Sequence, residues 1–376
     1  MLRGVHAPVP MARCRSAWPA ARGSLLLCLL LPALPAVAVP AGAAAADAPA
    51  PGAGGAADLI RHQGPCNAST ALPIGEGLFV MADNKAGPAV PLGLYRGGRE
   101  GGPIGRGLIP ARAVEPLAAG SGRLDLEASA RIGPLVYWIG SHGAARGGKG
   151  AGEPRPNHHR LFATNLGLRA SEDGKTISLS VERVGRPYSR LIEDLAADPR
   201  YAAFNLAKAA TLPAKAKGGL NIEGLAATPS GSLLIGFRNP TPGGKALLVP
   251  LRNPGAVLAG EAAMLGDPVL LDLGGLGVRS MEMVRGRLLI VAGAAEGGQE
   301  KDPELYRWSG QFESPAERLR SLKRKGEAFT PEALFADGDT LVLLSDDGGR
   351  TIEGKACEDL PEDRQSFREW RITPLP

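Results

Sequence analysis

Short runs of apolar residues recur along the chain, and each run follows a turn and ends in polar residues. Runs rich in Leu, Ile and Val and bounded by Gly, Asn and Asp are typical of buried β-strands. Before each turn stands a stretch of small residues, which opens on a carboxylate in four copies and on a serine in another. The five copies open at Ser69, Glu127, Glu223, Glu282 and Glu332.

Repetition of one strand-based unit predicts an all-β fold, a β-propeller whose blades surround a central axis. The five copies favour five blades, and the long interval between Glu127 and Glu223 leaves six as the alternative. Residues 188–212 break the pattern, because Ser189 is a helix-capping residue and apolar residues follow it at helical spacing. We therefore expect a short helical insertion at about 188–212, between two blades.

The last copy begins near Thr330 and shows three strands where a blade needs four. A strand near Leu59 is expected to complete this blade and close the ring. Ring closure would bring together Cys66, before the first copy, and Cys357, in the last copy. In an exported protein these cysteines are expected to form a disulfide, with two separate thiols as the alternative. The bond would close a very long loop and stabilise the fold by up to roughly 5 kcal/mol.

The N-terminal residues have the composition of an export signal. Four arginines precede an apolar core at residues 25–31, and small residues follow at 41–46. Prolines break the apolar segment, which is shorter than the roughly 20 residues of a membrane-spanning helix; a retained anchor is the alternative. We interpret residues 1–46 as a signal peptide, 47–57 as a disordered linker and 58–376 as one propeller domain of a periplasmic or secreted protein.

The net charge of +5, from 43 Lys and Arg against 38 Asp and Glu, depends on the leader. Residues 1–46 contain four of the arginines and no acidic residue, so the mature chain carries a net charge of +1. Nucleic-acid-binding proteins concentrate basic residues on one face, and this nearly neutral chain gives no such indication. We interpret the basic run at residues 318–325 as a solvated element and expect no nucleic-acid partner.

Equivalent residues of propeller blades meet around the central axis. Several carboxylates in contact cannot all remain ionised, because each raises the pKa of its neighbours and burial adds to this effect. A calcium ion, which takes oxygen ligands, would relieve the repulsion. The alternative is structural, with each glutamate holding neighbouring blades in register through hydrogen bonds to backbone amides. The predicted ring and its metal ligands are Ser69, Glu127, Glu223, Glu282 and Glu332.

Polar residues at the ends of the apolar runs form a second candidate site, because loops on one face of a rigid scaffold often carry function. Arg238 is expected to bind an anionic substrate through two donors. His142 is a candidate general acid or base near neutral pH; its alternative role is a hydrogen bond to the glycine-rich loop that follows it. Asp83, Asp346 and Asp347 are expected to position water or to act as a base.

Five segments of the chain carry a family resemblance: residues 137–142, 221–226, 233–240, 279–282 and 344–348. Together they resemble a bacterial family called domain of unknown function 3616, over nearly all of the chain after Cys66. The resemblance implies an exported propeller and brings no established activity. More distantly, the ring residues are similar to those of calcium-activated nucleotidases, whose five blades contribute about one Ser or Glu each to a central calcium. Propeller phytases and related esterase-like proteins, which also use calcium, are similar at the level of fold.

The sequence contains no G-x-S-x-G, H-E-x-x-H, C-x-x-C or Walker-type motif. Our first hypothesis is therefore a calcium-dependent hydrolase that acts on a small anionic phosphoester or phosphoanhydride. One alternative is a non-catalytic propeller that binds a ligand or partner across its rim. Another is an ester or lactone hydrolase that uses the same metal.

Overall fold

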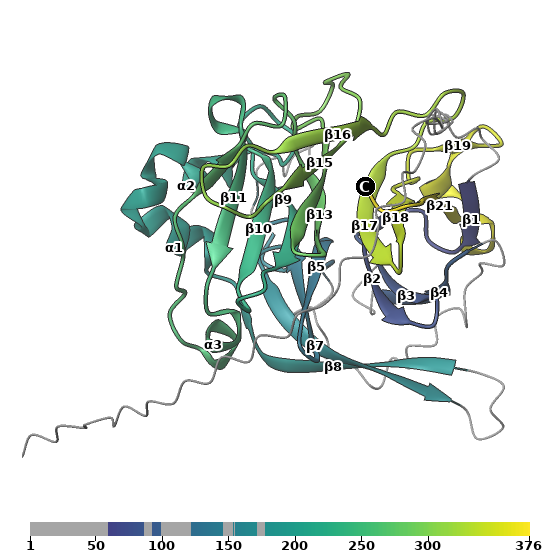
Figure 1. Ribbon diagram of the computed structural model, residues 1–376, viewed down its shortest axis with the longest axis horizontal. Helices are drawn as coiled ribbons and strands as arrows, with labels where there is room; N and C mark the ends of the chain where they lie inside the picture. Colours follow the sequence, from purple (N-terminus) through teal and green to yellow (C-terminus); the bar gives the residue numbers. More distant parts are fainter. Residues whose placement is uncertain (1–58, 86–91, 99–121, 146–152, 154, 171–176) are drawn as a thin grey trace, which may run out of the picture. The chain divides into compact units, whose positions relative to one another are not determined.

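The apolar runs form the strands of five small sheets that surround a common axis (Figure 1). The inner strand of each sheet packs against the inner strands of the two neighbouring sheets, so the sheets close into a ring. The fold is a five-bladed β-propeller, as the repeats predict. The predicted signal peptide and linker lie outside the part of the chain that this computed structural model describes. The described residues are 59–85, 92–98, 122–145, 153, 155–170 and 177–376.

Blades 1 to 4 follow one another along the chain, and each runs from an inner strand at the axis to an outer strand. Blade 1 has three strands among the described residues, and blades 2, 3 and 4 have four each. The strands are β2 (Ala68–Gly75), β3 (Leu78–Asp83), β4 (Leu92–Arg96), β5 (Leu126–Ile132), β6 (Leu135–Gly140), β7 (Leu161–Ala170), β8 (Ile177–Tyr188), β9 (Asn221–Ala227), β10 (Leu233–Asn239), β11 (Ala246–Leu251), β12 (Val269–Leu271), β13 (Gly277–Val284), β14 (Arg287–Gly293), β15 (Glu304–Trp308) and β16 (Glu317–Ser321).

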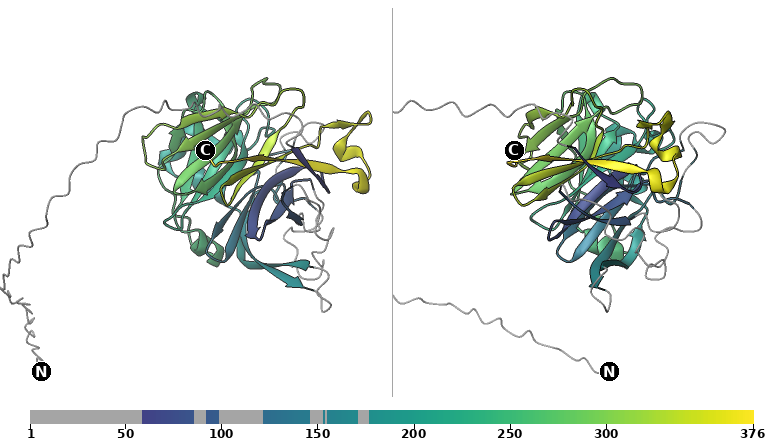
Figure 2. Two further views of the ribbon diagram at one scale, coloured as in Figure 1. Left: turned by 45° about the vertical axis from the view of Figure 1, so that its right-hand side comes forward. Right: turned by 90° about the vertical axis from the view of Figure 1, so that its right-hand side faces the viewer.

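Blade 5 joins the two ends of the folded region. The expected closing strand is β1, which pairs antiparallel with β21 from Leu59 opposite Trp370 to Gln63 opposite Ser366 (Figure 2). The disulfide between Cys66 and Cys357 is also confirmed. The elements of this blade are β1 (Leu59–Gln63), β17 (Pro331–Asp337), β18 (Thr340–Ser345), β19 (Thr351–Ile352), β20 (Lys355–Ala356), η5 (Cys357–Asp359), η6 (Glu362–Arg364) and β21 (Ser366–Ile372).

The helical insertion lies between blades 2 and 3, where the sequence predicts it. It contains α1 (Leu191–Ala197), η3 (Pro199–Phe204) and α2 (Leu206–Ala209). The buried residues of α1 pack in the apolar layer between the two blades. Two further short helices belong to blade 3, η4 (Pro242–Gly244) and α3 (Pro254–Ala259). Among the described residues, no helix is long and apolar enough to cross a membrane.

The hydrophobic core consists of five layers, one at each interface between neighbouring blades. Successive residues of a strand face opposite neighbours, so both faces of each sheet are buried. In β10, for example, Leu233 and Ile235 pack toward blade 2, whereas Leu234 packs toward blade 4. This arrangement explains why the strands appear in the sequence as continuous apolar runs and not as alternating patterns. It also leaves the axis free for polar residues.

Candidate functional site

A β-bulge near the start of every inner strand sends one side chain out of the sheet ladder. In blade 2, Leu126 pairs with Gly140 and Ala128 pairs with Ile139, so Glu127 has no partner on the neighbouring strand. Bulges of this kind redirect a side chain and are frequent beside functional sites. The residues skipped in the same way in the other blades are Ser69, Glu223, Arg279 and Glu332.

Four of the five predicted ring residues thus occupy equivalent bulge positions, whereas Glu282 of blade 4 does not. The bulge residue of blade 4 is Arg279, because Val278 pairs with Ala292 and Ser280 pairs with Val291. Glu282 lies further along β13 and pairs in regular register with Leu289. Burial raises the pKa of Glu282 to about 7, and Arg131 of blade 2 lowers it only in part. The fifth ring position thus carries a positive charge in place of the expected carboxylate.

Arg279 links the carboxylates of two other blades. Its Nε lies 3.1 Å from Oε2 of Glu223 in an ion-pair contact, and its Nη2 contacts Oε1 of Glu332. Arg238 of β10 donates from Nη1 to Oε1 of Glu223 over 2.8 Å and from Nε to the carbonyl oxygen of Ala294 over 2.9 Å. All four charged side chains are buried. The counter-charge that the ring requires is therefore supplied by the chain itself.

The protonation of this network follows from its contacts. Burial acts to raise the pKa of Glu223, but Arg238 and Arg279 outweigh it and hold the pKa below its ordinary value. Burial in turn lowers the pKa of Arg279, and Glu223 opposes that effect. We conclude that Glu223 remains ionised at neutral pH, with Arg238 and Arg279 as its partners.

The two remaining ring residues join blades 1 and 2. Ser69 Oγ donates to the carbonyl oxygens of Ala82 over 3.0 Å and of Leu126 over 2.6 Å. The amide of Asn84 lies 3.4 Å from both carboxylate oxygens of Glu127. The contact of Ser69 with the neighbouring blade agrees with the structural role that the sequence leaves open for the ring.

The ring residues Glu127, Glu223 and Glu332 lie on a pocket of about 450 Å³ at one end of the axis. Its lining is strongly polar, and the described lining residues include no Phe, Tyr or Trp. Apart from the ring residues and Arg238, the lining residues are Asn84, Lys85, Arg123, Asp125, Ser141, Ala144, Ala145, Arg155, His158, Ala214, Lys215, Asp346, Gly349 and Glu358. We call this the axial pocket.

One wall of the axial pocket joins Ser141, which belongs to the polar rim expected from the sequence, to Asp125 and His158, which the sequence did not assign to the site. Asp125 accepts a hydrogen bond of 2.6 Å from Ser141 Oγ, and its Oδ2 lies 3.3 Å from Nδ1 of His158. Asp125 has a φ of 51°, a left-handed conformation that non-glycine residues adopt rarely and often near functional sites. Burial lowers the pKa of His158, and Asp125 opposes the shift. Asp125 was not expected here because it stands before its strand, and His158 was not expected because the adjacent His158 and His159 carry no spacing signal.

His142 does not have the properties expected of a general acid or base near neutral pH. Its ring is fully buried, does not line the axial pocket, and places Nδ1 2.9 Å from the carbonyl oxygen of Gly140. Burial and the nearby His159 lower the pKa of His142 to about 3. The side chain is therefore neutral at pH 7, and its observed partner precedes the glycine-rich loop instead of lying within it.

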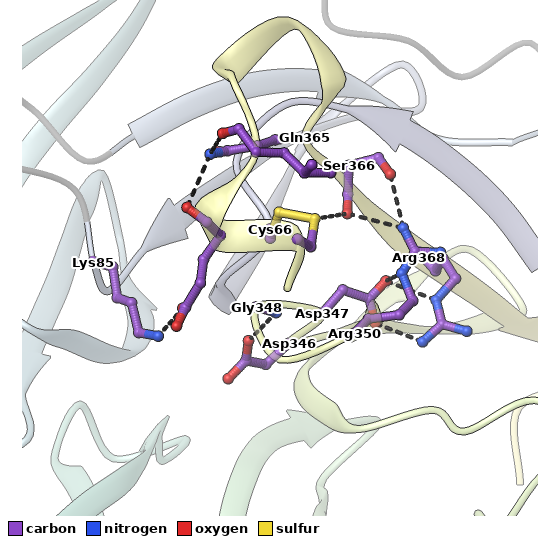
Figure 3. The surroundings of a disulfide bond; sticks show 12 residues. Cys66, Lys85, Asp346, Asp347, Gly348, Arg350, Gln365, Ser366 and Arg368 are labelled. Carbon is purple, nitrogen blue, oxygen red and sulfur yellow. Dashed lines mark hydrogen bonds and ion pairs between the residues drawn. A yellow bond between two sulfur atoms is a disulfide. The ribbon is translucent and has the colours of Figure 1, made fainter. Parts of the chain in front are cut away.

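The three aspartates predicted at the rim have different surroundings. Asp346 lines the axial pocket, whereas the buried Asp347 accepts hydrogen bonds from Arg368 Nε at 2.6 Å and Nη2 at 2.5 Å. Figure 3 shows Asp347 directed toward Arg368 and Asp346 directed away from it. Burial raises the pKa of Asp83 to about 6, and the nearby Asp346 contributes. Asp83 does not line the axial pocket, but it stands immediately before Asn84, which does, and it remains a candidate for proton transfer.

The ring does not have the donors of a calcium site. Arg238 and Arg279 stand beside Glu223 and Glu332, where calcium would need further oxygen ligands. Among the described residues, no group of three or more His, Cys, Asp or Glu side chains is placed to hold a metal ion. The ring residues therefore do not fit the predicted ion, and a calcium requirement stays a prediction that chelation tests.

Residues 162–331 match a family model. That family is described as protein of unknown function (DUF3616). The match runs from β7 of blade 2 to the first residue of β17, so it is shorter than the likeness expected from the sequence segments. It leaves out residues 137–142 and 344–348. A search of the curated proteins found no match.

Several solved structures are similar to the chain at low sequence identity. A GH43 β-1,3-galactosidase with galactodeoxynojirimycin is 10% identical to this chain, with a TM-score of 0.43. The similarity covers 81% of this chain and 90% of the galactosidase chain. The PQQ-bound aldose sugar dehydrogenase of Streptomyces coelicolor is 12% identical, with a TM-score of 0.37. The similarity covers 86% of this chain and 100% of the dehydrogenase chain.

A sialidase of Trypanosoma rangeli in complex with 2,3-difluorosialic acid is 12% identical with a TM-score of 0.36. The similarity covers 73% of this chain and 43% of the sialidase, so the chain spans less than half of that protein. At these scores the likenesses carry no argument about chemistry. The more distant likeness to calcium-activated nucleotidases and propeller phytases is not confirmed by them.

Proposed function

We propose that this propeller is a binding protein that holds a small polar molecule in the axial pocket. The observation that carries the proposal is the buried network of Arg238, Glu223, Arg279 and Glu332 beneath a polar cavity of about 450 Å³. Buried ion pairs contribute little stability compared with apolar residues of the same volume, because desolvation offsets their attraction. Where such a network faces a pocket, its charged groups are held in fixed positions and can bind a polar ligand.

The contacts of the predicted catalytic residues favour binding over catalysis. His142 lies outside the axial pocket and is neutral at pH 7. Asp347 is engaged by Arg368, and Arg238 donates both to Glu223 and to a backbone carbonyl. These groups therefore act mainly on each other. Nη2 of Arg238, which has no partner among the described residues, is left to face a ligand.

A substitution that narrows the axial pocket tests this function. Gly349 lines the pocket, its φ is not in the left-handed region, and an added Cβ would have no neighbour within 4 Å. Gly349→Trp is therefore expected to fold normally and to obstruct the pocket. The matched control is Gly255→Trp, at an exposed position in α3 with only an ordinary contact to Tyr137.

The measurement is a small-molecule screen by thermal shift and saturation-transfer NMR on the full mature chain. The proposal predicts ligands that stabilise the wild type and Gly255→Trp but not Gly349→Trp. Ligands that stabilise all three proteins equally would bind elsewhere and would contradict the proposal. A screen of several hundred polar metabolites without a single pocket-dependent ligand would contradict it as well.

The second candidate function is the hydrolysis of a phosphoester, a phosphoanhydride, an ester or a lactone. The observation that favours it is Asp83, whose pKa of about 6 lies near working pH and which stands close to Asp346. A carboxyl group whose pKa lies near the working pH can act as a general acid or base. Turnover of nitrophenyl phosphates or lactones that is lost in Asp83→Asn would support this function. It should be measured with calcium and with EDTA, since the calcium-dependent hydrolase was our first hypothesis.

A further inference from the structure

The geometry points to a hydroxylated organic anion as the ligand of the axial pocket, with its acidic group at Arg123 and Arg155 and its hydroxyl groups toward Glu332 and Asp346. This inference rests on the proposed binding function and names the chemical class of the ligand. A sugar acid and a sugar phosphate share this chemistry. The argument depends on which charges of the pocket are already compensated by the chain.

The carboxylates opposite blade 2 have partners within the protein. Glu332 contacts Arg279, Glu358 contacts Lys85, and Oδ1 of Asp346 accepts a hydrogen bond of 2.9 Å from the backbone amide of Gly348. Because these negative charges are balanced or hydrogen-bonded, the pocket does not require a cationic ligand. Carboxylate oxygens accept several hydrogen bonds each, so they retain capacity for the hydroxyl groups of a neutral segment.

The cations on the wall of blade 2 lack such partners. Arg123 and Arg155 line the pocket, are exposed, and form no hydrogen bond or ion pair with any described residue. Both lower the pKa of His158, so their charges act on the same part of the wall. Asp125, an acidic residue of the same wall, is held by Ser141 and His158. Two arginines around one compensated aspartate leave a local excess of positive charge.

An anionic group fits this wall in charge and in hydrogen bonding. Arginine forms two parallel hydrogen bonds with a carboxylate or phosphate, and such charge-assisted bonds are stronger than neutral ones. On blade 5, Glu332 and Asp346 offer carboxylate oxygens to the rest of the ligand. The described lining has no aromatic ring for stacking on a bare sugar face. Charge and hydrogen bonds, and not stacking, therefore decide what the pocket selects.

A matched set of three sugars tests the inference. D-Glucuronate, D-glucose and D-glucosamine share one ring and differ in charge, from negative through neutral to positive. Binding of each at millimolar concentration would be measured by saturation-transfer NMR and titration calorimetry with the oxidised, mature protein. The variants are Arg123→Gln and Arg155→Gln. The control is Arg287→Gln. Arg287 is exposed, lies at the turn of the β13–β14 hairpin, at the other end from Arg279, and has no partner among the described residues.

We expect glucuronate to bind at least about tenfold more tightly than glucose or glucosamine, the ratio that about 1.4 kcal/mol produces. Each pocket variant should weaken glucuronate binding by about tenfold, whereas Arg287→Gln should leave it unchanged. The inference is overturned if glucose or glucosamine binds as tightly as glucuronate. It is also overturned if neither Arg123→Gln nor Arg155→Gln weakens glucuronate binding, or if none of the three sugars binds. A ligand of another class that is lost in Gly349→Trp would leave the proposed function intact while this inference fails.

Discussion

At the scale of single residues, the decisive feature is that an arginine occupies the ring position of blade 4. Arg279 reaches Glu223 and Glu332 from two different blades, and all three side chains are buried. Repulsion among carboxylates around an axis requires a compensating charge, and this chain carries that charge in its own sequence. The network thereby joins blades 3, 4 and 5 at the floor of the axial pocket.

Replacing Arg279 by methionine should destabilise the fold by about 3–5 kcal/mol, because two buried carboxylates lose their shared partner. The measurement is denaturant unfolding at pH 7. A second substitution, Glu332→Gln, should recover part of the loss in the Arg279→Met background, since it removes one of the uncompensated charges. A single variant as stable as the wild type, or a double variant less stable than the single one, would contradict the network.

Glu282 predicts a pH dependence of stability. Its folded-state pKa of about 7 lies above the ordinary value of 4.5, so between these values the folded protein retains a proton that the unfolded chain has lost. Stability from this group is complete below pH 4.5 and falls as the pH rises toward 7. Glu282→Gln should remove this loss. The difference in free energy of unfolding between variant and wild type should therefore shift in favour of the variant by about 1–3 kcal/mol from pH 4.5 to pH 8. Parallel stability curves for the two proteins would contradict the prediction.

The sequence indicates four of the five ring residues correctly and misplaces the fifth for a physical reason. The search followed carboxylates, and blade 4 has its carboxylate three positions too late. The interval from Glu127 to Gly140 equals that from Glu332 to Ser345, and in each case the second residue pairs with the residue just before the bulge. The same interval counted back from Ala292 reaches Arg279, so strand spacing is a better guide to the bulge than residue type.

At the scale of elements, stability comes from apolar layers between blades. Each layer uses alternate residues of neighbouring sheets, and α1 extends the layer between blades 2 and 3 through Leu191, Ile192 and Leu195. The sequence predicts these strands and the insertion well, because burial on both faces leaves uninterrupted apolar runs. It does not predict the wall formed by Asp125, Ser141 and His158, since their approach depends on a left-handed residue and on side-chain contacts at the ends of neighbouring strands.

Leu191→Ala tests whether the helical insertion is part of the core. The side chain is fully buried, so its truncation should cost about 2–5 kcal/mol through lost burial and the cavity left behind. The matched control is Leu270→Ala, because Leu270 is 39% exposed and its truncation should cost much less. Unfolding in guanidinium chloride measures both. Equal effects of the two substitutions would show that α1 does not contribute to the core.

At the scale of the whole molecule, the ring is closed by one strand pair and one disulfide. β1 pairs with β21, and Cys66 is joined to Cys357 across a sequence separation of 291 residues. The disulfide lies beside the segment that carries Asp346 and Glu358 into the axial pocket, as Figure 3 shows for Asp346. Closure and pocket formation therefore depend on the same part of blade 5.

Replacement of both cysteines by serine should lower the free energy of unfolding by about 2–5 kcal/mol. A cross-link over so long a loop restricts the unfolded chain strongly, and both cysteines are fully buried in the folded protein. The comparison is between the oxidised wild type and the double variant in the same denaturant series. Identical unfolding midpoints would mean that strand pairing alone closes the ring.

The central claim is that the charges of the ring are balanced by Arg238 and Arg279 and not by a bound cation. The most direct test is the melting temperature of the wild-type protein in EDTA and in excess calcium. The account predicts the same melting temperature in both buffers. A clear fall in EDTA, restored by calcium, would contradict it.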